Sequence, residues 1–184
     1  QNNMDVQKTT IADCWLIKPK VFKDARGYFY ESFQKERFEA LTKISFNPIQ
    51  DNEAFSTYGV VRGLHLQEAP HAQAKLIRVL QGTILDVVVD LRKESPTFGA
   101  VVTAVLSQEN KEQLFVPKGC AHGYSVLSPE AVVFYKTDAY YHPETESGIL
   151  YNDEELNIDW GIPEEKQILS DKDLLWPTFK NYSL

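Results

Sequence analysis

Cysteine is scarce in this sequence of 184 residues, which holds only Cys14 and Cys120. The two residues form neither a CxxC pair nor the dense pattern of a disulfide-stabilised domain. This scarcity excludes the class of small, disulfide-rich secreted proteins. We expect both residues to be reduced thiols in a cytoplasmic protein.

Positive charge is also in short supply, because 19 Lys and Arg stand against 26 Asp and Glu, a net charge of −7. Nucleic-acid-binding domains show a basic surface, so this class is excluded. A small anionic ligand is not excluded, because a pocket sets its own local charge. No apolar run approaches the ~18 residues of a membrane span, and the sequence shows no secretory signal. We expect neither a nucleic-acid partner nor a membrane partner.

Aromatic residues are plentiful, with 10 Phe, 9 Tyr and 3 Trp, and short apolar runs recur between turn residues. This pattern predicts an all-β sandwich or barrel. We expect a single domain over residues 4–184 and interpret residues 1–3 (QNN), before Met4, as a cloning remnant. The expected strands are Ile11–Ile17, Gly27–Phe33, Val60–Leu66, Ala74–Leu80, Thr83–Leu91, Ala100–Leu106, Gln113–Val116, His122–Leu127 and Ala131–Thr137.

Two segments depart from the strand pattern. Residues 34–43 (QKERFEALTK) place Phe38 and Leu41 on one face at helical spacing, which predicts a short helix. The last forty residues, from about 145 to 184, are acidic and contain proline. We expect this segment to form short helices and coil that cover the β core.

Alternation along three predicted strands places polar side chains among apolar ones, because successive side chains of a strand point to opposite faces. Lys75 shares a face with Ile77, Asp86 shares one with Val88, and Tyr135 shares one with apolar neighbours. Each strand therefore carries a polar group at one end of an apolar face. This arrangement is typical of sandwiches and barrels with a polar-lined mouth.

The run VVRGLHLQ (60–67) combines a strand-like sequence with a cation and an imidazole. Arg62 keeps its charge and is expensive to bury unpaired, so the run indicates either a functional site or a solvated sheet edge. Arg62 and His65 are three residues apart, and a regular strand would place them on opposite faces. A bulge at Gly63, or a position of Arg62 at the rim, would bring both to one ligand.

Histidine is scarce as well. The four histidines are His65, His71, His122 and His142. Metal-binding barrels commonly use an HxH pair, but here the run His65-Leu66-Gln67 ends in glutamine, a poor ligand for a transition metal. A metal needs three or four good ligands, and only two of the histidines suit such a site. We therefore predict that this chain binds no metal ion.

Proton transfer without a metal suits the remaining groups. His65 is a candidate general base, which needs a group to orient it. Removing a proton next to a ketone requires stabilisation of the enolate oxygen, for which Lys75 is a candidate. Tyr135 is a weak acid suited to return a proton from the opposite face, so the three residues together would invert a carbon stereocentre. The structural alternatives are a strand-end lysine and a half-buried tyrosine, and His122 also suits a satisfied core histidine.

Two further motifs suit a nucleotide. Arg26 begins a predicted strand and offers a planar, multidentate partner for phosphate. The pair Tyr140-Tyr141 offers an aromatic plane on which a base can stack. The alternatives are a turn arginine in solvent and ordinary packing at the end of a strand.

Nine motifs, taken in order over about residues 8–177, resemble one family. They are RGYFYESF (26–33), QDN (50–52), VVRGLHLQ (60–67), QAKLIRVLQGTILDVVVDLR (73–92), SPTFG (95–99), FVPKGCAHGYSVLS (115–128), YKTDAYYHPE (135–144), GI (148–149) and LSDKD (169–173). In this order the chain closely resembles the dTDP-4-dehydrorhamnose 3,5-epimerase family. The resemblance implies a cupin-type jelly-roll β-barrel or sandwich with a few short peripheral helices, no metal or other cofactor, and a homodimer with a swapped N-terminal strand.

The resemblance also implies a reaction. It is the metal-independent epimerisation at C3 and C5 of dTDP-4-dehydro-6-deoxy-D-glucose to dTDP-4-dehydro-L-rhamnose, in dTDP-L-rhamnose biosynthesis. His65 matches the base that takes each proton next to the C4 ketone, and Asp173 matches the aspartate that orients it. Asp171 of the same SDKD run is the other candidate for that aspartate. Tyr135 matches the proton donor, and Lys75 matches the lysine that faces the enolate oxygen.

The resemblance assigns substrate contacts as well. His122 and Asp86 match a second His–Asp pair beside the sugar, Arg62 matches a diphosphate-binding arginine, and Tyr141 matches the tyrosine stacked on thymine. The further matched contacts, some of them across the dimer, are Arg26, Glu31, Gln50, Asn52, Glu146 and Lys172.

Departures from the family pattern occur at Leu66, Cys120 and Ser147, outside the acid–base set, and bear on fine specificity rather than on the reaction. Three alternatives stay open. One is a mono-epimerase that acts on only C3 or only C5 of a related nucleotide-linked keto sugar. The second is a metal-dependent cupin oxygenase, and the third is a sugar-nucleotide-binding module whose site is inactive.

Overall fold

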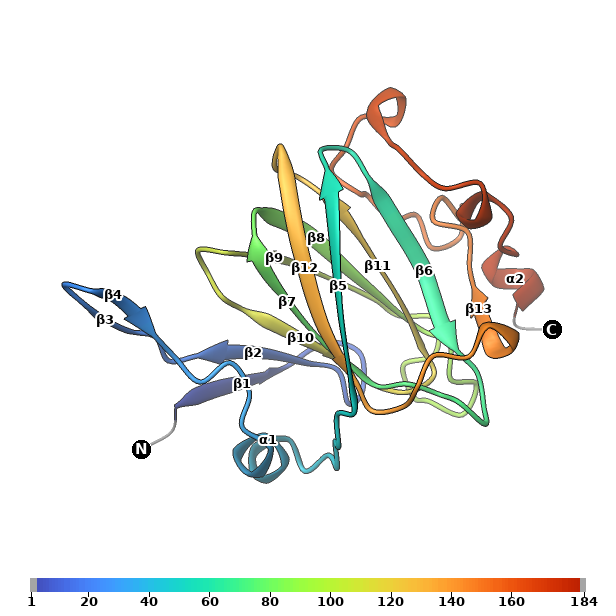
Figure 1. The fold of residues 1–184 in the computed structure, drawn as a ribbon. Coiled ribbons are helices and arrows are strands. Elements are labelled where there is room, and N and C mark those ends of the chain that lie inside the picture. The colour runs from blue at the N-terminus through green and yellow to red at the C-terminus, as the bar shows by residue number, and fades with distance from the viewer. Residues whose placement is uncertain (1–2, 183–184) are drawn as a thin grey trace.

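The computed structural model describes residues 3–182, so the last two residues of the predicted domain, 183–184, and residues 1–2 of the QNN segment lie outside the described residues. Two antiparallel sheets stack face to face in a β-sandwich (Figure 1). The predicted all-β class is confirmed. Within residues 3–182 the two sheets stay separate, so the predicted sandwich form is present and a closed barrel is not.

One sheet has six strands in the order β1-β2-β10-β7-β12-β5, and the other has five in the order β13-β6-β11-β8-β9. Neighbouring strands run antiparallel in both sheets, and β3 and β4 form a separate hairpin. The strands are β1 Met4–Lys8, β2 Trp15–Pro19, β3 Phe22–Asp24, β4 Gly27–Phe29, β5 Gln50–Thr57, β6 Val61–Gln67, β7 Lys75–Gln81, β8 Thr83–Asp90, β9 Val101–Ser107, β10 Gln113–Val116, β11 Cys120–Val126, β12 Glu130–Thr137 and β13 Glu146–Gly148.

Helix α1 (Lys35–Thr42) lies inside the predicted segment 34–43. The Gln34 side chain accepts a hydrogen bond from the Arg37 N–H at 2.7 Å and caps the first turn, and Lys43 ends the helix with φ 62°. The other helical segments are η1 Pro143–Thr145, η2 Glu164–Lys166, η3 Lys172–Leu174 and α2 Phe179–Tyr182. Among the described residues, no helix has the length and apolar character to cross a membrane.

The main core lies between the sheets, because alternate residues of the facing strands point inward. Ile77 of the six-stranded sheet and Val88 of the five-stranded sheet are both fully buried in it. Lys75 and Asp86 are two residues away from these side chains on the same inward faces, and Tyr135 packs against the core. The predicted alternation is therefore confirmed, and it directs three polar groups into the sandwich.

Each outer face of the sandwich has a cover of its own. Phe38 of α1 packs over Leu76 and Phe115 on the six-stranded sheet. The segment that follows β13 covers the five-stranded sheet through buried side chains that include Trp160 and Phe179. This second cover also brings η3 into contact with β6.

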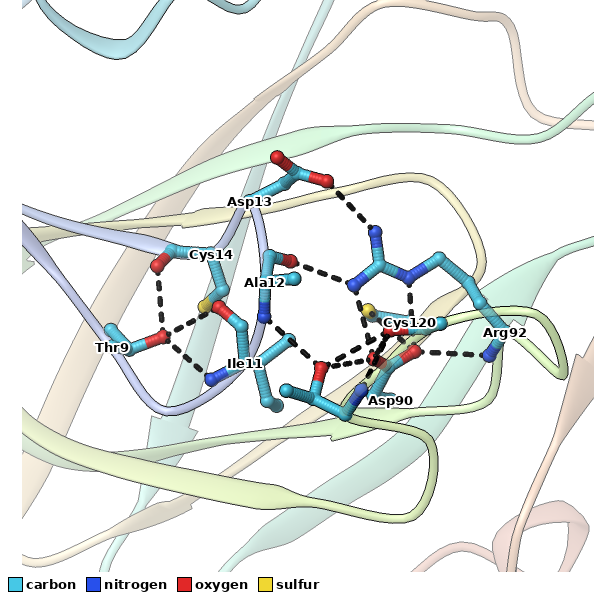
Figure 2. Close-up of polar contacts among 10 residues, drawn as sticks. Thr9, Ile11, Ala12, Asp13, Cys14, Asp90, Arg92 and Cys120 are labelled. Carbon is cyan, nitrogen blue, oxygen red and sulfur yellow. Dashed lines mark hydrogen bonds and ion pairs between the residues drawn. The ribbon is translucent and has the colours of Figure 1, made fainter.

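A buried ion pair fastens the loop before β2 to the end of β8. Arg92 donates to both carboxylate oxygens of Asp90, to the Ala12 carbonyl and to Asp13, so its guanidinium lies between the two aspartates (Figure 2). Burial alone would raise the pKa of Asp90, but the hydrogen bonds from Arg92 and two hydroxyl groups lower it to about 2. The N-terminal segment is thereby held against the sandwich.

Candidate active site

A pocket of about 320 Å³ opens at one end of the sandwich, where β5 and β7 begin and β6 and β12 end. Both sheets contribute side chains to it. Its lining residues are Gln50, Asn52, His65, Leu66, Gln67, Gln73, Lys75, Tyr135, Tyr141 and Glu146. All but Leu66, Gln67 and Gln73 are residues that the sequence predicted for the site.

Strand β6 has a bulge at the RGLH run. Arg62 pairs with Tyr124 of β11, and His65 pairs with His122. Over this interval β6 contains one residue more than β11, which is the definition of a bulge. Gly63 has φ +134°, and a Cβ at this position would lie 2.6 Å from the β11 backbone. Only glycine fits such a close approach. The bulge predicted at Gly63 is confirmed, and it places Arg62 and His65 on one face of the strand.

His65 is oriented by a carboxylate from the C-terminal cover. Its Nε2 lies 2.5 Å from Oδ1 of Asp173, which also accepts the Trp176 Nε1–H at 3.0 Å, while Oδ2 accepts the Gly63 N–H at 3.2 Å. Burial alone would raise the pKa of Asp173, but the hydrogen bond from His65 and these further bonds outweigh it, and the pKa is lowered. An ionised carboxylate only accepts, so Nε2 of His65 is the donor, and in the neutral tautomer of this imidazole the lone pair is on Nδ1. Asp171, the other candidate, is exposed.

Lys75 brings a buried cation to the pocket. Its residue surface is 8% exposed, and Nζ lies 5.7 Å from the centre of the Tyr135 ring. Burial lowers the pKa of Lys75 to about 8, although the negative charges of Asp86 and Glu146 oppose this shift. The lysine is mostly protonated at pH 7. A cation that has lost most of its water interacts strongly with an oxyanion that develops nearby.

Tyr135 is held by a hydrogen bond to Asn52, which faces it on β5. Burial raises the pKa of Tyr135, and the Asn52 hydrogen bond and the Arg62 charge oppose this shift only in part. The phenol is therefore neutral at physiological pH. It keeps a proton that a strongly basic carbanion can take.

A second imidazole–carboxylate pair lies deeper in the sandwich. His122 Nε2 is 2.5 Å from Oδ1 of Asp86, which is fully buried. Burial raises the pKa of Asp86 despite the charges of His122 and Lys75. The second carboxylate oxygen is buried without a hydrogen-bond partner. Because His122 pairs with His65 across the two strands, the two His–Asp pairs are neighbours.

Glu146 joins the pocket to the C-terminal cover. Its Oε2 accepts the Tyr141 hydroxyl at 2.5 Å and lies 2.7 Å from Nζ of Lys172. Burial alone would raise the pKa of Glu146, but the hydrogen bonds from Lys172 and Tyr141 lower it. Tyr141 is 47% exposed, so its ring is open to a stacking partner. Gln50 accepts the Tyr141 N–H at 3.2 Å and donates to Asn52 at 3.0 Å.

Arg62 is held beside the pocket rather than in its lining. Its guanidinium donates to Ser56 Oγ at 3.0 Å and to the Phe55 carbonyl at 3.2 Å. The pKa of Tyr135 is raised by burial, and the positive charge of Arg62 opposes part of this rise. Arg62 therefore lies within electrostatic reach of the proton-transfer groups. This position suits a partner for an anionic group bound next to the pocket.

Two predicted contact residues lie outside the pocket of their own chain. Arg26 is at the tip of the β3–β4 hairpin, where its side chain is 90% exposed and lies 2.6 Å from Asp24. Figure 1 shows this hairpin projecting from the sandwich, away from β6 and β13. Glu31 forms an ion pair with Arg37 of α1. A single chain therefore does not bring Arg26 and Glu31 to the other predicted residues.

Sequence reasoning missed four residues of the site. The residues Leu66, Gln67 and Gln73 line the pocket, and Trp176 donates to Asp173. Both glutamines fall inside the motifs that carry the resemblance, so their position was a usable signal. No local pattern marks Trp176, because its role depends on how the C-terminal cover folds back on β6.

Comparison with known proteins gives the chain its family. The family model described as dTDP-4-dehydrorhamnose 3,5-epimerase matches residues 8–181. This chain belongs to the dTDP-4-dehydrorhamnose 3,5-epimerase family. The family predicted from the motifs is thus confirmed, and the dTDP-4-dehydrorhamnose 3,5-epimerase of Shigella flexneri is 50% identical over 171 residues, which are 93% of each chain.

Solved structures of the family have the same fold. The dTDP-4-dehydrorhamnose 3,5-epimerase of Elizabethkingia anophelis NUHP1 superposes with a TM-score of 0.96 at 50% identity over 100% of both chains. The epimerase RmlC of Legionella pneumophila Philadelphia 1, solved in complex with dTDP-4-keto-L-rhamnose, gives a TM-score of 0.91 at 47% identity. That match covers 96% of this chain and 93% of the other.

Proposed function

We propose that this protein is an isomerase that converts dTDP-4-dehydro-6-deoxy-D-glucose to dTDP-4-dehydro-L-rhamnose by inverting C3 and C5. The observation that carries the proposal is the pocket itself, where the His65–Asp173 pair meets a buried cation, Lys75, and a neutral phenol, Tyr135. Membership of the epimerase family and the Legionella structure, which holds the product dTDP-4-keto-L-rhamnose, support the same reaction.

The proposed steps need only these side chains. Nδ1 of His65 takes the proton from a carbon next to the C4 ketone, and the electron pair of the broken C–H bond moves to the C4 oxygen. Lys75 stabilises this enolate oxygen, a contribution of about 3 kcal/mol for one well-placed group. As the enolate collapses, Tyr135 gives its proton to the opposite face of the carbon. The groups then return to their starting states by exchange with solvent, and the second carbon reacts in the same way.

The remaining predicted residues are proposed to bind the nucleotide and sugar. Arg62 holds the diphosphate, and Tyr141 stacks on the thymine with its hydroxyl fixed by Glu146. His122 and Asp86 lie beside the sugar below His65. The other proposed contacts are Gln50, Asn52 and Lys172, with Arg26 and Glu31 from a second chain.

A homodimer is proposed because the β3–β4 hairpin exposes large apolar side chains that are suited to a contact between subunits. Phe22, Tyr28 and Phe29 of β3 and β4 are 44%, 59% and 70% exposed. Such large apolar side chains gathered on one projecting element are typical of an interaction surface. A second chain that receives this hairpin would also receive Arg26 of the first chain at its own pocket. The swapped N-terminal strand that the resemblance implies stays a prediction, since β1 pairs here with β2 of its own chain.

We further propose a cytoplasmic location, supported by the two cysteines. Cys14 and Cys120 are buried free thiols. Burial raises the pKa of Cys14 to about 12 and raises that of Cys120 as well. Such thiols are protonated and unreactive, as suits a reducing compartment.

The decisive experiment is turnover of dTDP-4-dehydro-6-deoxy-D-glucose in D₂O, with NMR location of deuterium in the product. We expect deuterium at both C3 and C5. His65→Ala should abolish the uptake at both carbons while it leaves dTDP binding largely unchanged, and Tyr135→Phe should permit exchange without full inversion.

Label at one carbon only would establish a mono-epimerase instead. Good dTDP binding without any exchange by the wild type would indicate an inactive binding module, and metal-dependent turnover would indicate an oxygenase-type site.

A further inference from the structure

Two loops beside the pocket bring His71, His142 and Glu144 to one place. His71 lies in the loop between β6 and β7, and the other two residues follow β12. Each residue offers one ligand atom, and these three atoms all lie within 4.8 Å of one another. None of the three belongs to the proposed acid–base set.

The three side chains are arranged with their donors together. The rings of His71 and His142 stack with their centres 3.5 Å apart and their planes 17° from parallel. Nδ1 of His142 lies 3.2 Å from a carboxylate oxygen of Glu144. His142 and Glu144 are partly and largely exposed, with 37% and 65% of their side-chain surfaces accessible, so an ion from solvent can reach them.

The backbones that carry these side chains are fixed by hydrogen bonds. Gln73 donates from its side chain to the Ala139 carbonyl at 2.8 Å, which joins the two loops directly. Gln67 accepts the His142 N–H at 3.3 Å and the Thr145 hydroxyl at 2.8 Å. These bonds fix the two loop backbones that carry the donor side chains.

We propose that His71, His142 and Glu144 bind a divalent transition-metal ion of the Zn²⁺ type, with water in the fourth position. Two imidazoles and one carboxylate are a common set of three protein ligands for Zn²⁺. Bonds of about 2.0–2.2 Å place tetrahedral ligand atoms about 3.4 Å apart, so the donors must close by up to about 1.4 Å and the two stacked rings must turn toward the ion when it binds. Co²⁺ should bind more weakly and Cu²⁺ more tightly at the same ligands.

Occupation of this site would link the two loops that border the pocket. Gln73 on one loop and Tyr141 on the other both line that pocket. Because the ion binds the folded arrangement and not the separated loops, it should raise the melting temperature in proportion to the logarithm of its concentration. The epimerisation proposed above does not use this ion.

The test is titration of tag-free, chelator-treated protein with Zn²⁺ by calorimetry and with Co²⁺ by its visible absorption. We expect one saturable ion per chain and a melting temperature that rises with Zn²⁺. Loss of an outer partner usually weakens metal binding by about 10–100-fold, so His71→Ala and Glu144→Gln should each weaken it by at least about tenfold. His65→Ala and the exposed Glu165→Gln are the matched controls and should bind like the wild type.

Glu144→Gln keeps the size of the side chain, so its result stands even if His71→Ala folds poorly, which circular dichroism would reveal. Wild-type protein without a saturable site would overturn the proposal. So would binding that survives in His71→Ala and Glu144→Gln but disappears in His65→Ala, because the ion would then occupy the pocket.

Discussion

At the scale of one residue, burial of the charged Lys75 side chain in the pocket lowers the stability of the folded chain. Burial lowers the pKa of Lys75 from 10.5 to about 8, so keeping the ammonium group charged in the folded chain costs about 3 kcal/mol. The negative charges of Asp86 and Glu146 offset only part of the free energy that the ammonium group loses on leaving water. A hydrophobic side chain would suit this position between two sheets better, so the stability of the fold does not account for a charge here.

Lys75→Met should therefore stabilise the protein and abolish most of its activity. The expected gain is up to about 3 kcal/mol below pH 8, because the folded chain no longer buries a charge. Between pH 8 and 10.5 the unfolded wild-type chain binds a proton that the folded one does not, so wild-type stability rises with pH and the gain shrinks. Urea denaturation at pH 7 and at pH 10 measures both values, and Lys118→Met, whose side chain is 57% exposed, serves as the control.

Asp173 and Asp171 offer a matched pair for testing the orienting carboxylate. Asp173→Asn keeps the shape but offers Nε2 of His65 an amide in place of a carboxylate, so the imidazole loses its working tautomer and its charge partner. We expect kcat to fall by about 10³-fold or more, by analogy with the aspartate of serine-protease triads. Asp171→Asn, an exposed change two residues away, should leave kcat within about twofold. Equal losses in the two variants would contradict the assignment.

At the scale of the element, β6 and β5 show why local sequence patterns predict one strand and miss its neighbour along the chain. The RGLH run of β6 carries both the bulge glycine and the catalytic candidate, so the sequence predicted strand and site together. Strand β5 was not predicted, because its inward residues Gln50 and Asn52 are polar. They face the pocket instead of the apolar core, and the alternation of apolar residues that identifies a strand is absent.

Gly63→Ala tests the bulge. A Cβ at this position meets the β11 backbone at 2.6 Å and requires φ +134°, so we expect a loss of about 2 kcal/mol or more and a lower kcat as His65 shifts. Gly27→Ala is the control, because Gly27 has φ +135° but nothing within 4 Å of its added Cβ. The difference between the two melting temperatures isolates the clash with β11 from the cost of the backbone conformation. If both variants lose the same stability, close packing at Gly63 has no special role.

At the scale of the whole molecule, the position of Arg26 makes the assembly testable. Arg26 lies at the tip of a projecting hairpin, outside its own pocket. If a second chain receives that hairpin, each active site combines His65 of one subunit with Arg26 of the other. The purified protein should then sediment as a dimer.

Mixed dimers of His65→Ala and Arg26→Ala chains provide the corresponding activity test. Each parent should be weakly active or inactive at low substrate concentration. A mixed dimer contains one site with both substitutions and one site with neither, so activity should reappear after the two proteins are unfolded and refolded together. Activity that stays at the level of the parents would place Arg26 in its own chain's site or outside the site altogether.

The sequence by itself determined the fold class and the family, and it supplied the residues proposed to react, because strand alternation and ordered motifs are local properties of the chain. The resemblance also implied the His65–Asp173 pair, which the structure brings into contact over 108 positions. Only the tertiary structure decided that His71 meets His142 from a different loop. The pKa of Lys75 also follows from burial between two sheets. Contact and loss of water depend on how distant segments pack, and no short stretch of sequence records that packing.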